Sequence, residues 1–216
     1  EAAALYGIDA ANGAIVITTK RGKAGTGGFE YSNSFRVEST RGRPETQRIY
    51  GPSSVGSTTF LYYGTPYPDG TRFYDNVDGF FQTAVTQKHN LAFSGATSDS
   101  RIGYRVSTSS TRQEGVIPGS RYDRVNVTGT SRAEVTNWLT TDVSLQYSTD
   151  ANDQPFKGAS GPLIGLLVWP DTINARDYVT PAGTRRRLTA LALSSEVDNP
   201  YFSINRNKSN SSTNRL

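Results

Sequence analysis

Five stretches of this chain alternate apolar and polar residues with a period of two. Successive side chains of a β-strand point to opposite faces, so each stretch predicts a strand with one apolar and one polar face. We expect these strands at about residues 28–38, 87–97, 101–112, 122–135 and 138–149. The chain therefore predicts an all-β fold in which a sheet separates two different surroundings.

The connections between the predicted strands alternate between short and long. Residues 98–100 and 136–137 form the short ones, whereas residues 39–86 and 113–121 form longer ones and an irregular stretch of about residues 150–213 follows the fifth strand. Outer-membrane barrels have an apolar outer surface, a polar interior, short periplasmic turns and longer extracellular loops. The pattern thus predicts an antiparallel transmembrane β-barrel segment whose first strand runs outward.

Composition agrees with a barrel that has little packed interior. Only 35% of the residues are hydrophobic, yet 11% are aromatic, which argues against disorder. The chain has no cysteine, so it can form neither a disulfide nor a thiolate metal site. Its net charge is +4, but the only basic run is Arg185–Arg187, so we expect no nucleic-acid binding.

The chain reads as a piece of a longer protein. It lacks a start methionine and a signal segment, and its longest apolar run, Leu163–Trp169, is too short for a membrane-spanning helix of about 20 residues. At most six strands are visible, fewer than the eight of the smallest outer-membrane barrels. We therefore expect an incomplete barrel.

The first 22 residues predict a different kind of unit. Residues 1–7 read as the end of a helix stopped by Gly7, Asn12-Gly13 as a tight turn, and residues 14–19 as a covered strand. The Gly-rich residues 23–28 then predict a hinge, and residues 29–216 hold the strands and loops.

This N-terminal unit resembles the C-terminal end of the plug domain in TonB-dependent outer-membrane receptors, most closely the SusC/RagA branch of Bacteroidota. The motif consists of Tyr6, Gly7, Asn12, Gly13, Thr18, Thr19, Lys20 and Gly22. Segments 87–91, 113–117, 124–126 and 199–202 are similar to the first barrel strands and loops of that branch. Asp9 departs from the family, which commonly has a basic residue there.

The resemblance implies a parent protein that imports nutrients across the outer membrane of a Gram-negative bacterium. The implied substrate is a glycan or oligosaccharide, or alternatively a peptide. The implied partners are outer-membrane lipid, a SusD-like surface lipoprotein, and TonB, which would engage an N-terminal part that this sequence lacks. The resemblance implies no enzyme activity and no cofactor.

Aromatic residues in the long connections are candidate contacts for a ligand or for the lipoprotein lid. They are Tyr62, Tyr63, Tyr67, Tyr74 and Trp169. Aromatic rings stack on sugar faces, but rings in such loops also pack against one another and cap a barrel. Both interpretations remain open from the sequence, and for Trp169 the packing role is favoured.

No spacing in the chain predicts a catalytic or metal site. His89 is the only histidine, and its neighbours Lys88 and Asn90 supply no carboxylate. The acidic pairs of the loops lack the spacing of a calcium-binding loop, so turn formation explains them. We therefore predict no catalytic, metal-binding or cofactor-binding residues.

Two other functions remain open. A soluble β-sandwich that serves as a carbohydrate-binding or adhesin module also has alternating strands and loop aromatics. A siderophore-type TonB receptor would share the architecture and differ in its ligand.

Overall fold

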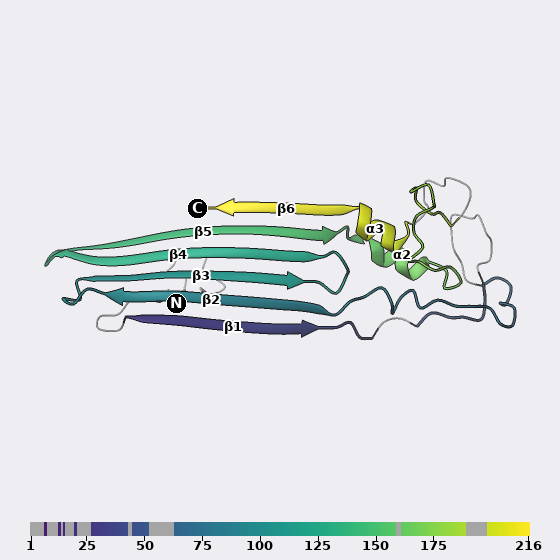
Figure 1. The fold of residues 1–216 in the computed structure, drawn as a ribbon, viewed down its shortest axis with the longest axis horizontal. Coiled ribbons are helices and arrows are strands. Elements are labelled where there is room, and N and C mark those ends of the chain that lie inside the picture. The colour runs from purple at the N-terminus through teal and green to yellow at the C-terminus, as the bar shows by residue number, and fades with distance from the viewer. Residues whose placement is uncertain are drawn as a thin grey trace. The chain divides into compact units, whose positions relative to one another are not determined.

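The strands of the chain form one six-stranded sheet in the order β1-β2-β3-β4-β5-β6 (Figure 1). The computed structural model describes residues 7, 13, 15, 20, 27–42, 45–51, 63–158, 161–188 and 198–216. Each strand pairs with its sequence neighbours, and neighbouring arrows in Figure 1 run in opposite directions. The predicted all-β antiparallel fold is therefore confirmed.

All five strands expected from the alternating pattern are present. They are β1 (Gly28–Glu38), β2 (Ala84–Ala96), β3 (Ile102–Glu114), β4 (Arg121–Thr136) and β5 (Leu139–Pro155). β3 and β4 run further than expected, so their connection shrinks to residues 115–120. β5 likewise continues well past residue 149, through residues in which no apolar alternation remains.

A sixth strand, β6 (Lys208–Arg215), was not expected from the sequence. It pairs antiparallel with β5 in an unbroken register from Ser148 opposite Arg215 to Pro155 opposite Lys208. β6 contains no apolar residue, so it carries no hydrophobic period. Its place is set by backbone hydrogen bonds to β5, and the expectation of an irregular stretch over residues 150–213 is wrong.

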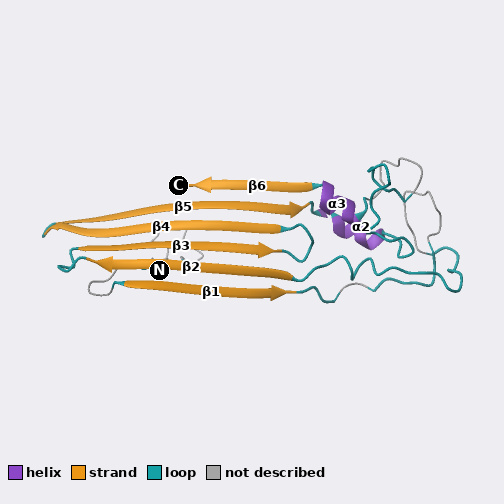
Figure 2. Ribbon diagram, in the orientation of Figure 1, coloured by secondary structure: helices purple, strands orange, loops and turns teal. Residues whose placement is uncertain are grey.

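Two short helices also lie within that stretch, α2 (Pro162–Val168) and α3 (Pro200–Arg206), drawn in purple in Figure 2. Each has proline in its first turn, where the missing N–H costs no helical hydrogen bond. The side chain of Asn199 caps α3 by accepting from the backbone N–H groups of Tyr201 and Phe202. Among the described residues, no helix has the length and apolar character needed to cross a bilayer.

The chain divides into two compact units. Unit 1 comprises Glu1–Glu30, Leu91–Ser107 and Thr128–Gln146, and unit 2 comprises Tyr31–Asn90, Thr108–Val127 and Tyr147–Leu216. Unit 2 contains a core of Phe80, Leu166 and Ile204, against which Phe81 and Tyr201 pack. This core joins the long connections to α2 and α3.

Of the predicted domain division, the N-terminal unit over residues 1–22 lies almost wholly outside the described residues. Gly7 and Gly13 are described, with φ of +85° and +106°. Such angles are favourable for glycine and costly for other residues, as expected where a helix ends and where an Asn-Gly turn is made. The helix and strand predicted around them remain predictions.

Candidate functional site

One side of the strands in unit 1 is apolar and exposed. These side chains are Phe29, Leu91, Phe93, Ile102, Tyr104, Val106, Val135, Leu139, Val143 and Leu145. Phe29 is 71% exposed and Leu145 68% exposed. Trp138, at the short connection between β4 and β5, is 83% exposed. Within the described residues nothing covers this surface.

The strands of unit 2 continue the same alternation. Their exposed apolar residues are Tyr31, Phe35, Val37, Val125, Val127 and Tyr147. His89 belongs to this set, because its Nδ1 lies 2.8 Å from Tyr31 Oη and 2.9 Å from Asn33 Nδ2. An amide nitrogen only donates, so Nδ1 accepts from Asn33. The hydrogen-bond partners of His89 among the described residues are thus a phenol hydroxyl and an amide, and neither is a carboxylate.

The opposite side of unit 1 carries charged residues that pair with one another. Glu30 of β1 accepts from Arg105 Nη2 of β3 at 3.0 Å and from Lys20 Nζ at 3.2 Å. The bridge to Arg105 passes over β2, the strand that lies between β1 and β3. Arg132 and Asp142 form a looser pair at 3.7 Å between β4 and β5. The polar face is therefore held together by side-chain interactions across strands.

In unit 2 the polar face combines an ion pair between Arg36 and Glu38 at 3.1 Å with hydrogen bonds of amide and hydroxyl groups. Asn90 Nδ2 donates to Ser32 Oγ at 3.2 Å, and Asn126 Nδ2 donates to Ser109 Oγ at 3.1 Å. Arg124 Nε donates to Asn126 Oδ1 at 3.0 Å. A surface of this kind is suited to contact with water or a polar ligand, whereas the apolar face is not.

Two buried asparagines organise the long connections of unit 2. Asn76 Nδ2 donates to the carbonyl oxygens of Pro170 and Ile173 at 3.2 and 2.9 Å. Its Oδ1 accepts from the N–H of Ala175 at 3.0 Å. Asn199 caps α3 and also donates to the Ala175 carbonyl at 2.8 Å. These amides hold the connections around the core described above. Their partners in residues 170–175 lie far away in the sequence, so these hydrogen bonds could not be predicted from it.

The predicted contact residues occupy different environments. Tyr63 is 83% exposed, whereas Trp169 is 3% exposed and covered by protein. Tyr67 packs edge-on against Phe73, with 5.1 Å between ring centroids. Burial, reinforced by the Asp171 carboxylate, raises the pKa of the Tyr67 hydroxyl. Tyr62 lies outside the described residues.

Tyr74 packs under Arg72, whose guanidinium carbon is 4.9 Å from the ring centroid. Among the described residues, no two of Tyr63, Tyr67, Tyr74 and Trp169 form a ring contact with each other. These side chains therefore do not form one aromatic cluster. Their role in ligand or lid binding stays a prediction.

Of the predicted plug-end motif, Gly7, Gly13 and Lys20 are described, and Lys20 is the residue that pairs with Glu30. The motif's other members, Tyr6, Asn12, Thr18, Thr19 and Gly22, lie outside the described residues. In the part of the chain that the structure describes, no three acidic or histidine side chains are grouped so that they could hold a metal ion.

Comparison with known proteins gives two partial similarities. The chain is 32% identical over 126 residues to the TonB-dependent receptor SusC of Bacteroides thetaiotaomicron, a match covering 57% of the chain and 12% of the receptor. It is 26% identical over 135 residues to the TonB-dependent receptor P3 of Formosa agariphila, covering 62% of the chain and 13% of the receptor. The matches thus span about an eighth of the length of these curated relatives. No protein-family model matches the chain.

Proposed function

We propose that the chain forms part of the barrel of a TonB-dependent transporter in the outer membrane of a Gram-negative bacterium. The observation that carries the proposal is the exposed apolar face of the sheet, opposite a polar face held by ion pairs and hydrogen bonds. The partial similarity to two TonB-dependent receptors supports it independently.

The free energy gained by moving apolar side chains out of water favours lipid as the partner of the apolar face. Burying a large apolar side chain is worth roughly 1.5–3 kcal/mol, and water-soluble monomers rarely expose contiguous apolar patches larger than a few hundred Å². The residues of this face lie side by side on paired strands, so hydrocarbon would cover them without any second protein layer. The proposal also requires the free edges of β1 and β6 to pair with further strands, because lipid cannot satisfy backbone groups.

The lengths of the connections indicate which ends of the strands would face the periplasm and which would face the cell surface. Residues 97–101 and 137–138 form compact turns, whereas residues 39–83 and 156–207 form the longest connections. In barrels of this kind the short turns face the periplasm. The ordered core around Phe80, Leu166 and Ile204 would then lie at the cell surface, where a substrate first arrives.

The transported substrate that we propose is a glycan or oligosaccharide, with a peptide as the alternative. TonB would supply energy from the inner membrane, and a SusD-like lipoprotein would cover the extracellular mouth. We propose no enzyme activity. The similarity to the TonB-dependent receptor SusC supports this branch over a siderophore receptor.

A fractionation and growth experiment tests the proposal. The protein, expressed at its natural length, should be found in the outer-membrane fraction. Deletion of its gene should abolish growth on one polysaccharide and leave iron uptake unchanged. Recovery of a soluble, monomeric product with a cooperative melt after expression without a signal would instead support the β-sandwich module.

Loss of iron uptake after the deletion, with polysaccharide growth intact, would move the assignment to the siderophore class. Loss of growth on a peptide medium alone would retain the transporter and replace the glycan by a peptide.

A further inference from the structure

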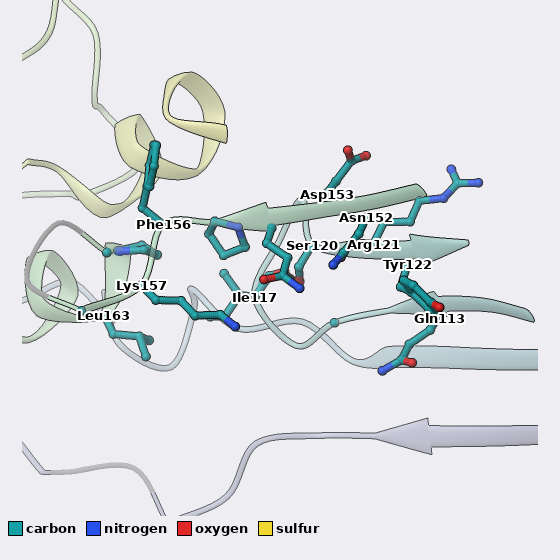
Figure 3. Close-up of a pocket in the computed structure, with 16 residues that line it drawn as sticks. Gln113, Ile117, Ser120, Arg121, Tyr122, Asn152, Asp153, Phe156, Lys157 and Leu163 are labelled. Carbon is teal, nitrogen blue, oxygen red and sulfur yellow. Dashed lines mark hydrogen bonds between the residues drawn. The ribbon is translucent and has the colours of Figure 1, made fainter. Parts of the chain in front are cut away.

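A pocket of about 330 Å³ lies in unit 2, at the end of the strands where the long connections begin (Figure 3). Its lining comes from three parts of the chain: the β3–β4 connection with the adjoining strand ends, the last residues of β5 with the segment that follows, and the first turn of α2. The volume is at the lower end of the range of roughly 300–1,000 Å³ for small-molecule sites.

Four uncharged polar residues of the lining belong to the polar face of the sheet. Gly115 N–H donates to the Ser120 carbonyl, and two residues further along each strand this register places Gln113 opposite Tyr122. Figure 3 shows these two side chains close together. Asn152 and Gln154 share the β5 alternation with the buried Ser148, which lies on that face.

The hydrogen-bonding groups of these four side chains have no partner among the described residues, although each side chain is half-buried. Elsewhere in the same unit, the amides of Asn76 and Asn199 each donate to and accept from protein groups. Half-buried amides and hydroxyls are usually satisfied by protein or water. Gln113, Tyr122, Asn152 and Gln154 therefore offer donors and acceptors that remain available to a ligand.

The charges in and beside the lining balance one another, once Asp123 outside the lining is counted as the partner of Arg121, and they favour an uncharged ligand. Arg121 is neutralised by Asp123, with 2.5 Å between Nε and Oδ2. Lys157 and Asp153 contribute one positive and one negative charge. An anionic or cationic ligand would gain no net attraction from this set, and it would still lose its hydration.

The remaining lining is apolar and the site is preformed. Ile117, Pro162 and Leu163 provide hydrocarbon surface, and Phe156 is 46% exposed beside them. The β3–β4 connection is fixed by Gln82, whose Nε2 donates to the Gly115 carbonyl at 2.9 Å and whose N–H donates to Val116 at 3.0 Å. A preformed site avoids much of the ordering cost of binding.

We propose that this pocket is a subsite for one end of an uncharged, hydroxyl-rich ligand, that is, a neutral oligosaccharide. Sugar hydroxyls both donate and accept, as amides and the tyrosine hydroxyl do, while the C–H faces of a sugar ring suit the apolar lining. The proposal rests on the proposed function and adds the place and the charge class of the substrate.

The test uses the protein at its natural length, purified in detergent and applied to an array of neutral oligosaccharides, acidic oligosaccharides and neutral peptides. Neutral oligosaccharides should be captured. Asn152→Ala with Gln154→Ala should weaken that binding about tenfold, the loss expected for two hydrogen bonds. Gln154→Glu, which keeps the shape and introduces a charge, should weaken it as well.

The matched control is Gln146→Ala, which removes the same side chain from the same face of β5, outside the pocket. It should change binding less than twofold, and all variants should melt at the wild-type temperature. Capture of acidic oligosaccharides or peptides in place of neutral oligosaccharides overturns the proposal. So does an array that captures no neutral oligosaccharide, or equal effects of the pocket and control variants.

The experiments distinguish the subsite from the transporter. Normal outer-membrane location and uptake, with no effect of the pocket variants, would reject the subsite and keep the transporter. Loss of binding in the pocket variants of a protein found outside the outer membrane would keep the subsite and reject the transporter.

Discussion

At the scale of single residues, Asn199 is the clearest case of one side chain stabilising several segments. It is 1% exposed, accepts from two N–H groups of α3, and donates to the Ala175 carbonyl. Asn199→Ala removes a helix cap worth about 1 kcal/mol and leaves a buried carbonyl unsatisfied at about 1–3 kcal/mol. We expect local unfolding around α3 to become easier by about 2–4 kcal/mol, measured by hydrogen exchange of peptides covering residues 170–176 and 198–206.

Asn205→Ala is the matched control, since this asparagine lies on the same helix, is exposed, and donates only to the Tyr201 carbonyl. Its effect should stay within about 0.5 kcal/mol. Similar exchange rates in the two variants would show that the cap does not stabilise the connections.

Asp99 provides a prediction about pH at the same scale. Thr97 Oγ1 donates to its carboxylate at 2.6 Å and the Arg101 N–H donates at 3.2 Å. These hydrogen bonds, that of Thr97 first, hold the pKa of Asp99 below its usual 3.8. Because the pKa is lower in the folded chain, the carboxylate stabilises the fold above the unfolded pKa, and this is lost as the pH falls through the folded value.

A carboxyl NMR titration checks this pKa. Thr97→Val should raise the pKa of Asp99 toward its usual value, whereas Ser98→Ala, one residue further along the same turn, should leave it unchanged. A pKa that rises equally in both variants would mean that the Thr97 hydroxyl is not the cause.

At the scale of elements, α2 and α3 depend on a close approach at Gly165. A Cβ at this position would collide with the carbonyl oxygen of Asp198, which is backbone and cannot swing away. Gly165→Ala gains at most about 1 kcal/mol of helix propensity, but overpacking costs typically about 1–3 kcal/mol. We expect a net loss of stability, seen as faster protease cleavage in residues 161–168.

Gly129→Ala makes the same substitution in β4, where nothing lies within 4 Å of the added carbon. This variant should resist protease like the wild type. Equal resistance of Gly165→Ala would show that the two helices separate at little cost.

The elements differ in how much of them can be predicted from the sequence. β1 to β5 can be predicted because each strand has one apolar and one polar face, so apolar and polar residues alternate along its sequence. β6 has only polar residues, so its pairing with β5 leaves no such mark. α2 has seven residues and no side-chain cap, so packing stabilises it and not its local sequence. α3 begins with the Asn199 side-chain cap and Pro200, a combination typical of a helix start, although no helix was predicted there.

The sites follow the same logic. The two faces of the sheet could be predicted, since a face is a property of one strand at a time. The pocket could not be predicted, because Gln113, Tyr122, Asn152 and Gln154 meet only through strand register and the path of the chain after β5. The exposed Tyr63 and buried Trp169 show the same limit, since burial depends on distant segments.

At the scale of the whole molecule, the two faces of the sheet differ in whether they tolerate an introduced charge. Leu145 is 68% exposed on the apolar face, and Ser144 precedes it on the polar face. An arginine on a lipid-facing strand costs about 2–4 kcal/mol near the bilayer midplane, while a lumenal position tolerates it. We expect Leu145→Arg to lower the yield of folded protein in lipid vesicles and Ser144→Arg to leave it near wild type, scored as the heat-modifiable band on a gel.

Equal yields of the two variants would show that the apolar face does not contact lipid. The main support for a barrel would then be lost. A selective loss for Ser144→Arg would reverse the assignment of the two faces.

Glu30 keeps a partner when its contact with Lys20 is lost. Its carboxylate serves two cations, so if Lys20 withdraws, Glu30 keeps the guanidinium of Arg105 at 3.0 Å. Loss of Lys20 therefore leaves the Glu30 carboxylate paired, and the contact that breaks is an exposed one that solvent screens. The acceptor that Lys20 would meet on returning is thus still held in place by Arg105.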